Sequence, residues 1–114
     1  MSKQFESPVR TFEFEGAFYH ILITPVGDEW HSILTAQYDH LVEAFGESTI
    51  NGYSDKIDAE WYIAGDYDIA RLYNWKNGRA YLGDAGPATE NVTVWQIRTR
   101  KLKTIDEVLS RIGK

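Results

Sequence analysis

The alternation of apolar and polar residues at positions 57–63 is the feature that most constrains the fold of this chain. Four apolar residues recur at every second position, namely Ile57, Ala59, Trp61 and Ile63. The residues between them are Asp58, Glu60 and Tyr62. A period of two places successive side chains on opposite faces of an extended strand. We therefore expect a strand with one buried apolar face and one solvent-facing, acidic face.

Further extended segments are separated by turn signals. The other expected strands are residues 11–15, 18–24, 68–75, 80–82 and 92–99. Asn77-Gly78 is a typical hairpin turn, which makes residues 80–82 a short returning arm, and residues 83–90 are then a loop. Residues 28–35 form a connection whose conformation the pattern does not define.

A first helix is expected after Thr35, which is a suitable N-cap, and Gly46 is expected to end it. The helical spacing comes from Tyr38, Leu41, Val42 and Phe45. The residues left on its solvent side are Asp39, His40 and Glu43.

A second helix is expected near the C-terminus, where residues 104–107 (Thr-Ile-Asp-Glu) have the form of a capping box. Its apolar stripe consists of Ile105, Val108, Leu109 and Ile112. Amphipathic helices and half-apolar strands bury their apolar sides by packing as layers. We expect an α+β fold in the order ββαββββα, with an antiparallel sheet of five to six strands and two helices on one face. The absence of linkers and repeats favours one domain spanning residues 1–114.

The charges are divided unevenly along the chain. Residues 11–70 contain twelve acidic residues and one basic residue, whereas residues 71–114 contain nine basic and four acidic residues. The net charge is −5. An acidic surface repels nucleic acids and anionic membranes and attracts basic partners. We therefore expect a basic protein partner and no direct binding to nucleic acid or membrane.

Motifs for common chemistries are missing from the sequence. It has no cysteine, no nucleophile elbow and no phosphate-binding glycine loop. The three histidines, His20, His31 and His40, lack metal-ligand spacing. Asp66 and Asp68 could offer oxygens to Mg²⁺ or Ca²⁺, but turn aspartates more often bond their own backbone. We expect a cytoplasmic, non-enzymatic protein without metal or cofactor, and Met1 begins no apolar leader segment.

Acidic and aromatic residues are concentrated in the predicted central strands. The expected partner-binding residues are Asp58, Glu60, Tyr62, Asp66 and Asp68. A different hypothesis is a small-ligand or nucleotide-binding domain with a pocket between sheet and helix. The residues that would line this pocket are Trp61, Arg71, Tyr73 and Trp75. A third hypothesis is a virion or complex assembly protein, for which a defined homo-oligomer would be the mark.

Three segments carry a resemblance to a known group of proteins: residues 56–61 (KIDAEW), 70–81 (ARLYNWKNGRAY) and 95–97 (WQI). The pattern K-x-D-A-E-W, Y-N-aromatic-K-x-G-K/R-x-Y and W-x-I resembles that of small proteins of phages and large DNA viruses. Gln96 departs from it, since a histidine often follows the last tryptophan. A small, acidic phage protein without cysteine is also similar in character to anti-CRISPR and other anti-defence proteins. The resemblance implies an inhibitor that occupies the basic groove of a nucleic-acid-binding host protein.

Overall fold

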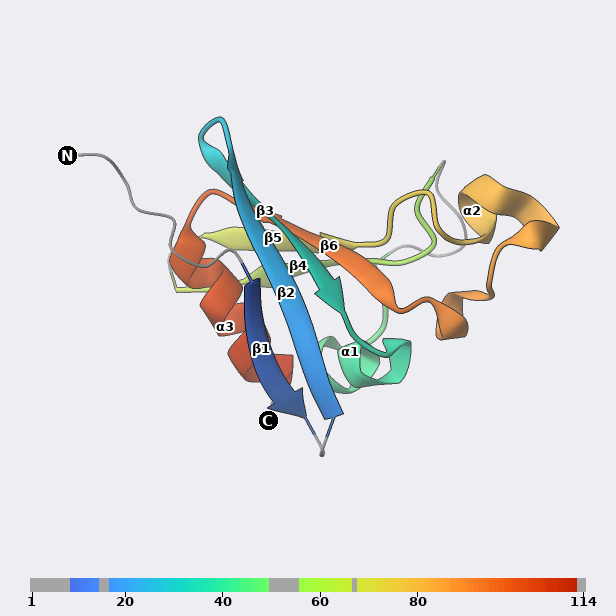
Figure 1. The fold of residues 1–114 in the computed structure, drawn as a ribbon, viewed down its shortest axis with the longest axis horizontal. Helices are drawn as coiled ribbons and strands as arrows, with labels where there is room; N and C mark the ends of the chain where they lie inside the picture. The colour runs from blue at the N-terminus through green and yellow to red at the C-terminus, as the bar shows by residue number, and fades with distance from the viewer. Residues whose placement is uncertain (1–8, 15–16, 50–55, 67, 113–114) are drawn as a thin grey trace.

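The computed structural model describes residues 9–14, 17–49, 56–66 and 68–112, which form one six-stranded antiparallel sheet with helices (Figure 1). The strands are β1 (Val9–Phe14), β2 (Ala17–Val26), β3 (Glu29–Thr35), β4 (Glu60–Ala64), β5 (Ile69–Tyr73) and β6 (Val94–Thr99). The helices are α1 (Tyr38–Phe45), α2 (Arg79–Leu82) and α3 (Leu102–Ile112), with 3-10 turns η1 (Gly83–Ala85) and η2 (Thr89–Asn91). The expected α+β class is confirmed. Glu15, at the end of the first expected strand, lies outside the described residues.

Strand β6 joins two parts of the sheet that are far apart in sequence. The strand order is β1-β2-β3-β6-β5-β4, so the last strand lies between β3 and β5. Ile97 of β6 is in register with Ser32 on one side and with Leu72 on the other. The sheet therefore becomes continuous only when this C-terminal strand has paired on both of its edges.

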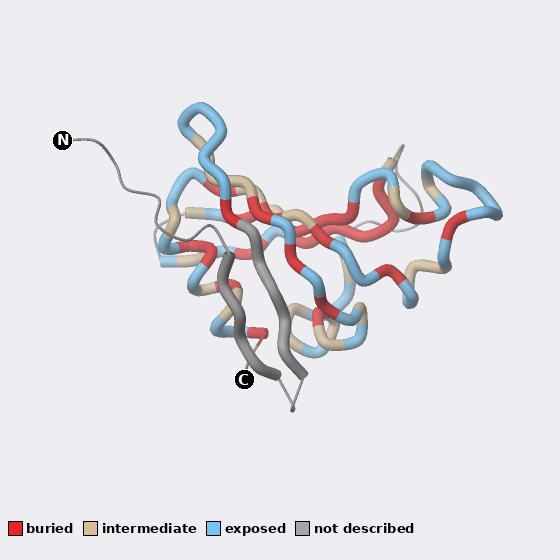
Figure 2. Tube along the Cα trace, viewed as in Figure 1, coloured by how far each residue is buried: buried red, intermediate tan, exposed pale blue. Residues whose placement is uncertain are grey.

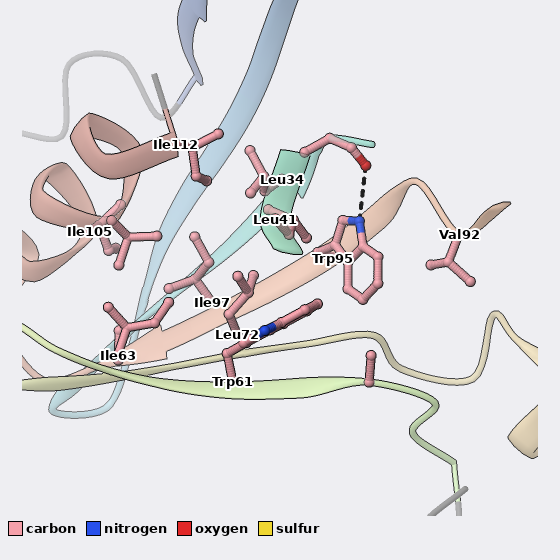
Figure 3. Close-up of a cluster of buried hydrophobic side chains, with 14 of the residues drawn as sticks. Leu34, Leu41, Trp61, Ile63, Leu72, Val92, Trp95, Ile97, Ile105 and Ile112 are labelled. Atoms are coloured by element: carbon pink, nitrogen blue, oxygen red, sulfur yellow. Dashed lines mark hydrogen bonds between the residues drawn. The ribbon is translucent and has the colours of Figure 1, made fainter. Parts of the chain in front are cut away.

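Helices α1 and α3 pack against each other and cover the same face of the sheet (Figure 1). Leu41 of α1 and Ile105 of α3 are fully buried in one cluster with Trp61, Trp95 and Ile97 of the sheet (Figure 3). The indole N–H of Trp95 donates to the carbonyl of Ala36, 3.0 Å away, which fixes the start of α1 relative to β6. The expectation that the two predicted helices lie on one face is confirmed.

The strongest sequence patterns match the observed burial. All four apolar residues of the alternating segment are buried, while Tyr62 is 59% exposed. The apolar stripe of α3 also faces the core, with Ile105, Val108 and Ile112 fully buried. Gly46 ends α1 with a φ of 86°, a conformation that a residue with a Cβ rarely adopts. Periodicity therefore identified the apolar residues that are buried, although Asp58 and Glu60 between them are buried as well.

Residues 28–35 are not an irregular connection, because most of them form β3. Ser32 and Leu34 are buried on the helix side, whereas Ile33 and Thr35 are exposed on the other side. This alternation was hard to recognise in the sequence because one inward-facing position is a serine. Thr35 consequently ends β3 rather than capping α1; the N-cap is Gln37, which makes no side-chain capping bond.

Residues 80–82 do not form a returning strand, because the chain enters helix α2 at Arg79. The positive φ in this turn, 61°, belongs to Lys76 and not to the Asn-Gly pair, so the expected hairpin turn is absent. Asp58 explains the difference, since its carboxylate accepts the N–H of Ala80 at 3.1 Å and fixes the first turn of α2. Figures 1 and 2 show α2 as a largely exposed projection beyond the end of the sheet. The loop expected at residues 83–90 contains η1 and the start of η2.

The predicted capping box at Thr104 and Glu107 is also absent. Helix α3 begins at Leu102, and the N–H of Thr104 already donates to the carbonyl of Lys101 at 3.0 Å. Thr104 lies inside the helix and is fully buried, while the Glu107 carboxylate accepts the N–H of Asp66. The observed order of strands and α-helices is therefore βββαββαβα and not the expected ββαββββα, since three strands precede α1 and helix α2 replaces the expected strand at residues 80–82.

Asn74 holds the segment that precedes β4 to the segment that follows β5. Its Oδ1 accepts the N–H groups of Asp58 at 2.7 Å and Ala59 at 3.1 Å, and its Nδ2 donates to the Asp58 carboxylate at 2.9 Å. Asn74→Ala is expected to lower the free energy of unfolding by about 3 kcal/mol, because buried N–H groups lose their acceptor. Asn91→Ala, at an exposed position, should cost less than about 0.5 kcal/mol. Urea denaturation of both variants is the measurement, and equal losses would contradict this role.

Candidate functional site

The acidic residues expected to contact a partner are mostly bonded within the chain. Asp58 is only 5% exposed, and its carboxylate accepts hydrogen bonds from Asn74 and from the N–H of Ala80. Glu60 is 8% exposed and forms an ion pair with Nε of Arg71 on the neighbouring strand. The expectation that these two carboxylates face solvent is therefore wrong. The alternation of residues in a strand predicts which side chains share a face. It does not show which cations and amide groups of other segments bond to those side chains.

Asp68 is likewise bonded, in this case to the start of α3. Its carboxylate accepts the backbone N–H of Arg100 at 3.1 Å and lies 3.2 Å from the Arg100 guanidinium. The guanidinium hydrogen bond, followed by backbone N–H groups, lowers the pKa of Asp68 far below its usual range. Of the five expected contact residues, Asp66 and Tyr62 remain exposed. An acidic surface on β4 and β5 is therefore largely neutralised.

The four residues of the alternative ligand pocket do not surround one cavity. Trp61 is buried in the core, where its indole N–H donates to the carbonyl of Gly46 at 2.8 Å. Arg71 and Tyr73 alternate with buried Leu72 and lie on the opposite face of the sheet, with the guanidinium carbon 4.1 Å from the Tyr73 ring centroid. Trp75 follows at the end of the strand, 41% exposed and edge-on to Tyr73. The sheet thus separates Trp61 from the other three.

The exposed carboxylates gather instead on α1 and η2, which pack against each other. We call this the acidic α1–η2 surface, and its members are Asp39, Glu43, Glu47 and Glu90, all of them exposed. Residues 36–49 and 88–97, which contain these elements, include no lysine or arginine. The negative charge of this surface is therefore not compensated by its own segments.

Tyr38 lies at the centre of the acidic α1–η2 surface. Its ring is stacked on Trp95, with centroids 6.2 Å apart, and also contacts Trp61, so the core supports it from below. Burial raises the pKa of the Tyr38 hydroxyl, and the negative charges of Glu47, Asp39 and Glu90 raise it further. Three carboxylates, one from α1, one from the segment that follows α1 and one from η2, therefore act on one phenol.

A cleft of about 270 Å³ opens beside Tyr38. Its lining residues are Gln37, Tyr38, Asp39, Glu90, Asn91 and Thr93. Carboxylate, amide and hydroxyl oxygens dominate this lining, which suits the N–H groups of a basic side chain. The arrangement can accept hydrogen bonds from a cation at the surface, with the Tyr38 ring as a rigid neighbour.

Neither a metal site nor a helix that could cross a membrane occurs among the described residues. Within them, no group of three or more histidine, aspartate and glutamate side chains could hold a metal ion. None of the helices formed by these residues has the length and apolar character needed to span a bilayer.

Sequence reasoning missed the acidic α1–η2 surface as a site, although part of the signal was visible. The helical pattern already placed Asp39 and Glu43 on the solvent side of the first helix. The absence of lysine and arginine from residues 36–49 was a second indication. Glu90 could not be assigned to the same surface, because only the folded chain brings η2 against α1.

The raised pKa of Tyr38 gives a direct check of this electrostatic environment. The folded state favours the neutral phenol of Tyr38. The contribution of this group to the stability of the fold is therefore fully present below the ordinary tyrosine pKa, and it is lost as the pH rises through the raised pKa. Replacing two of its three acidic neighbours, Asp39→Asn with Glu90→Gln, should lower the pKa of Tyr38, which stays above its ordinary value because the ring is still buried and Glu47 is still charged. Titration of the Tyr38 Cζ signal by NMR measures this. Glu43→Gln is the control, and an equal effect from it would contradict the specific role of the two neighbours.

The lowered pKa of Asp68 predicts an acid-sensitive contact between the β4–β5 turn and the connection from β6 to α3. A carboxylate with a depressed folded-state pKa stabilises the fold above its unfolded-state pKa, and this contribution is lost as the pH falls through the folded-state value. Stability should therefore decline below about pH 4, and Asp68→Asn should flatten this decline. Urea midpoints measured across the acid range test it. If Asp84→Asn, at an exposed position of η1, flattened the curve equally, the Asp68–Arg100 contact would not be the cause.

Comparisons with protein-family models, with curated proteins and with solved structures found no match for this chain. The resemblance to phage and viral proteins stays a prediction. What bears on function in the folded chain is therefore the charge and geometry of its surfaces, above all the acidic α1–η2 surface.

Proposed function

We propose that this domain is a non-enzymatic binding protein whose acidic α1–η2 surface docks on a basic, nucleic-acid-binding protein. The observation that carries the proposal is the convergence of Asp39, Glu47 and Glu90 around Tyr38, without any lysine or arginine in the segments that supply them. A partner built to bind phosphates presents clustered cations, which exposed carboxylates can occupy in place of phosphates. Binding of this kind would exclude nucleic acid from the partner by competition.

The support beneath the acidic surface favours binding by a preformed interface. Tyr38 is stacked on Trp95, and Trp95 is fully buried in the central strand and bonded to the carbonyl of Ala36. Rigid aromatic residues at the centre of a polar rim are typical anchors of protein interfaces. The carboxylates provide long-range attraction, and Tyr38 with the adjoining cleft provides contact area that needs little further ordering.

The nature of the partner is narrowed by charge and by the sequence resemblance. The net charge of −5 disfavours anionic partners, and the acidic α1–η2 surface concentrates this charge on one side of α1. The resemblance to phage and viral proteins favours a host defence or nucleic-acid-processing protein, so the biological role proposed is that of an anti-defence inhibitor acting in the host cytoplasm.

Charge reversal on the acidic α1–η2 surface tests the proposal. The variant Asp39→Lys with Glu43→Lys should lose binding to basic nucleic-acid-binding proteins by about tenfold or more, since rim and core charge pairs across an interface each contribute up to a few kcal/mol. The matched control is Asp28→Lys with Asp84→Lys, which changes the net charge equally at two exposed turns. The measurement is quantitative mass spectrometry of proteins captured from host lysate by wild type and by both variants, at low and at high salt.

The expected change in the set of captured proteins depends on the variant and on the salt concentration. Nucleic-acid-binding proteins should be captured by wild type and control at low salt, and lost with the α1 variant or at high salt. An unchanged set of captured proteins with the α1 variant, with folding verified by circular dichroism, would refute docking through this surface. Equal loss with both variants would show that only overall charge matters.

A further inference from the structure

A second cleft lies between the β4–β5 turn and α3. Its volume is about 270 Å³, close to the lower end of the range for small-ligand sites. Its lining residues are Ile63, Ala64, Gly65, Asp66, Thr104, Glu107, Val108, Ser110 and Arg111. No residue of this cleft belongs to the acidic α1–η2 surface, so whatever occupies it would bind independently of the proposed partner.

Two opposite charges in this cleft are held apart although they lie one helical turn from each other. Glu107 and Arg111 have the i, i+4 spacing at which helical ion pairs commonly form. In the described structure the Glu107 carboxylate instead accepts the N–H of Asp66, at 3.0 and 3.1 Å from its two oxygens. The Arg111 guanidinium carbon lies 5.0 Å from the ring centroid of Phe45. Each group is thus positioned by a different neighbour, and the two charges do not pair.

The close approach of the β4–β5 turn to α3 builds one wall of the cleft. A Cβ at Gly65 would lie 2.2 Å from Oε1 of Glu107 and 3.2 Å from Cγ2 of Thr104. Only a glycine allows this approach without displacing Glu107. The turn therefore fixes the carboxylate at the edge of the cleft rather than leaving it to the solvent.

Apolar groups complete the lining of the cleft. Ala64, at the end of β4, is exposed and lies in the lining beside Ile63, and the Cγ2 methyl of Thr104 faces the turn at Gly65. Thr104 is fully buried, so its hydroxyl is held in the interior and does not reach the cleft. An aliphatic group can cover this part of the lining without the loss of a hydrogen bond.

We propose that this cleft binds a small aliphatic zwitterion of the free α-amino acid class. The ammonium group is placed at the carboxylate of Glu107, and the carboxylate group at the guanidinium of Arg111. The aliphatic side chain covers the apolar part of the lining at Ala64 and Ile63. Asp66 adds a second negative charge at the cationic end. A ligand with one charge alone would satisfy one end of the cleft and leave the other unpaired.

The probes that test this proposal are L-norvaline, n-butylamine and pentanoate, titrated at millimolar concentrations and followed by the backbone amide signals of the full chain. L-Norvaline carries both charges, while the other two carry one each on a similar aliphatic chain. The expected result is that L-norvaline shifts the amide signals of Gly65 and Asp66 and that both single-charge probes bind at least about tenfold more weakly, since each lacks one charge-assisted contact. Equal binding of n-butylamine would show a cation site, and absence of shifts at Gly65 and Asp66 would overturn the proposal.

Substitutions at the two charged ends give the second arm of the test. Glu107→Gln keeps an oxygen that can accept the Asp66 N–H, and Arg111→Gln removes the positive charge without filling the cleft. Each should weaken L-norvaline binding by about tenfold. Asp84→Asn, at an exposed position of η1, is the matched control and should leave the affinity unchanged. If all three variants bound equally, the zwitterion assignment would be wrong, whereas the outcome of charge reversal on the acidic α1–η2 surface would be unaffected.

Discussion

The pairing of β6 with both β3 and β5 is the constraint on which the remaining structure depends. The strand arrives last in sequence among the six, yet it occupies an interior position of the sheet, with Trp95 and Ile97 fully buried. Through Trp95 it also positions α1, because the indole donates to the carbonyl of Ala36 and its ring supports Tyr38. The chain that leaves β6 forms α3, whose stripe closes the same core. Both clefts described above are therefore placed by this one strand, the first through Tyr38 and the second through the start of α3.

Internal bonding explains why the acidic residues on β4 and β5 are unsuitable as the main binding surface. Asp58 is bonded to Asn74 and the first turn of α2, Glu60 is paired with Arg71, and Asp68 is held by Arg100. A buried charge must be paired or bonded to offset the loss of its hydration. These carboxylates therefore connect elements that are distant in sequence. Carboxylates on α1 and η2 have no such partner cations within their segments, and their charge remains available to another molecule.

The parts of the fold that could be predicted were those encoded by long local patterns. The two-residue period of positions 57–63 and the stripe of α3 were sufficient to define a buried strand face and a buried helix face. Strand β3 was missed because Ser32 occupies an inward position, and α2 was missed because Asp58, twenty-two positions earlier, fixes Ala80 and overrides a local Asn-Gly turn signal. The acidic α1–η2 surface was only half visible, since Asp39 and Glu43 follow from helical spacing whereas Glu90 reaches α1 through tertiary packing. Contacts over such separations leave no periodic trace in a single sequence.

Thr104 and Glu107, which form a capping-box motif in the sequence, have other roles in the structure. Thr104 and Glu107 have the identity and spacing for capping a helix locally, and that role would satisfy both side chains. Helix α3 starts two residues earlier, where the Thr99 hydroxyl accepts the N–H of Lys101. This shift carries Thr104 into the interior with an unbonded hydroxyl and frees Glu107 to bind the turn at Asp66. An unbonded buried hydroxyl is unfavourable, so this use of Glu107 comes at a cost in stability at Thr104. Residues that look functional in the sequence, the clustered acids of β4 and β5, thus maintain the fold, while residues that look structural form the surfaces open to other molecules.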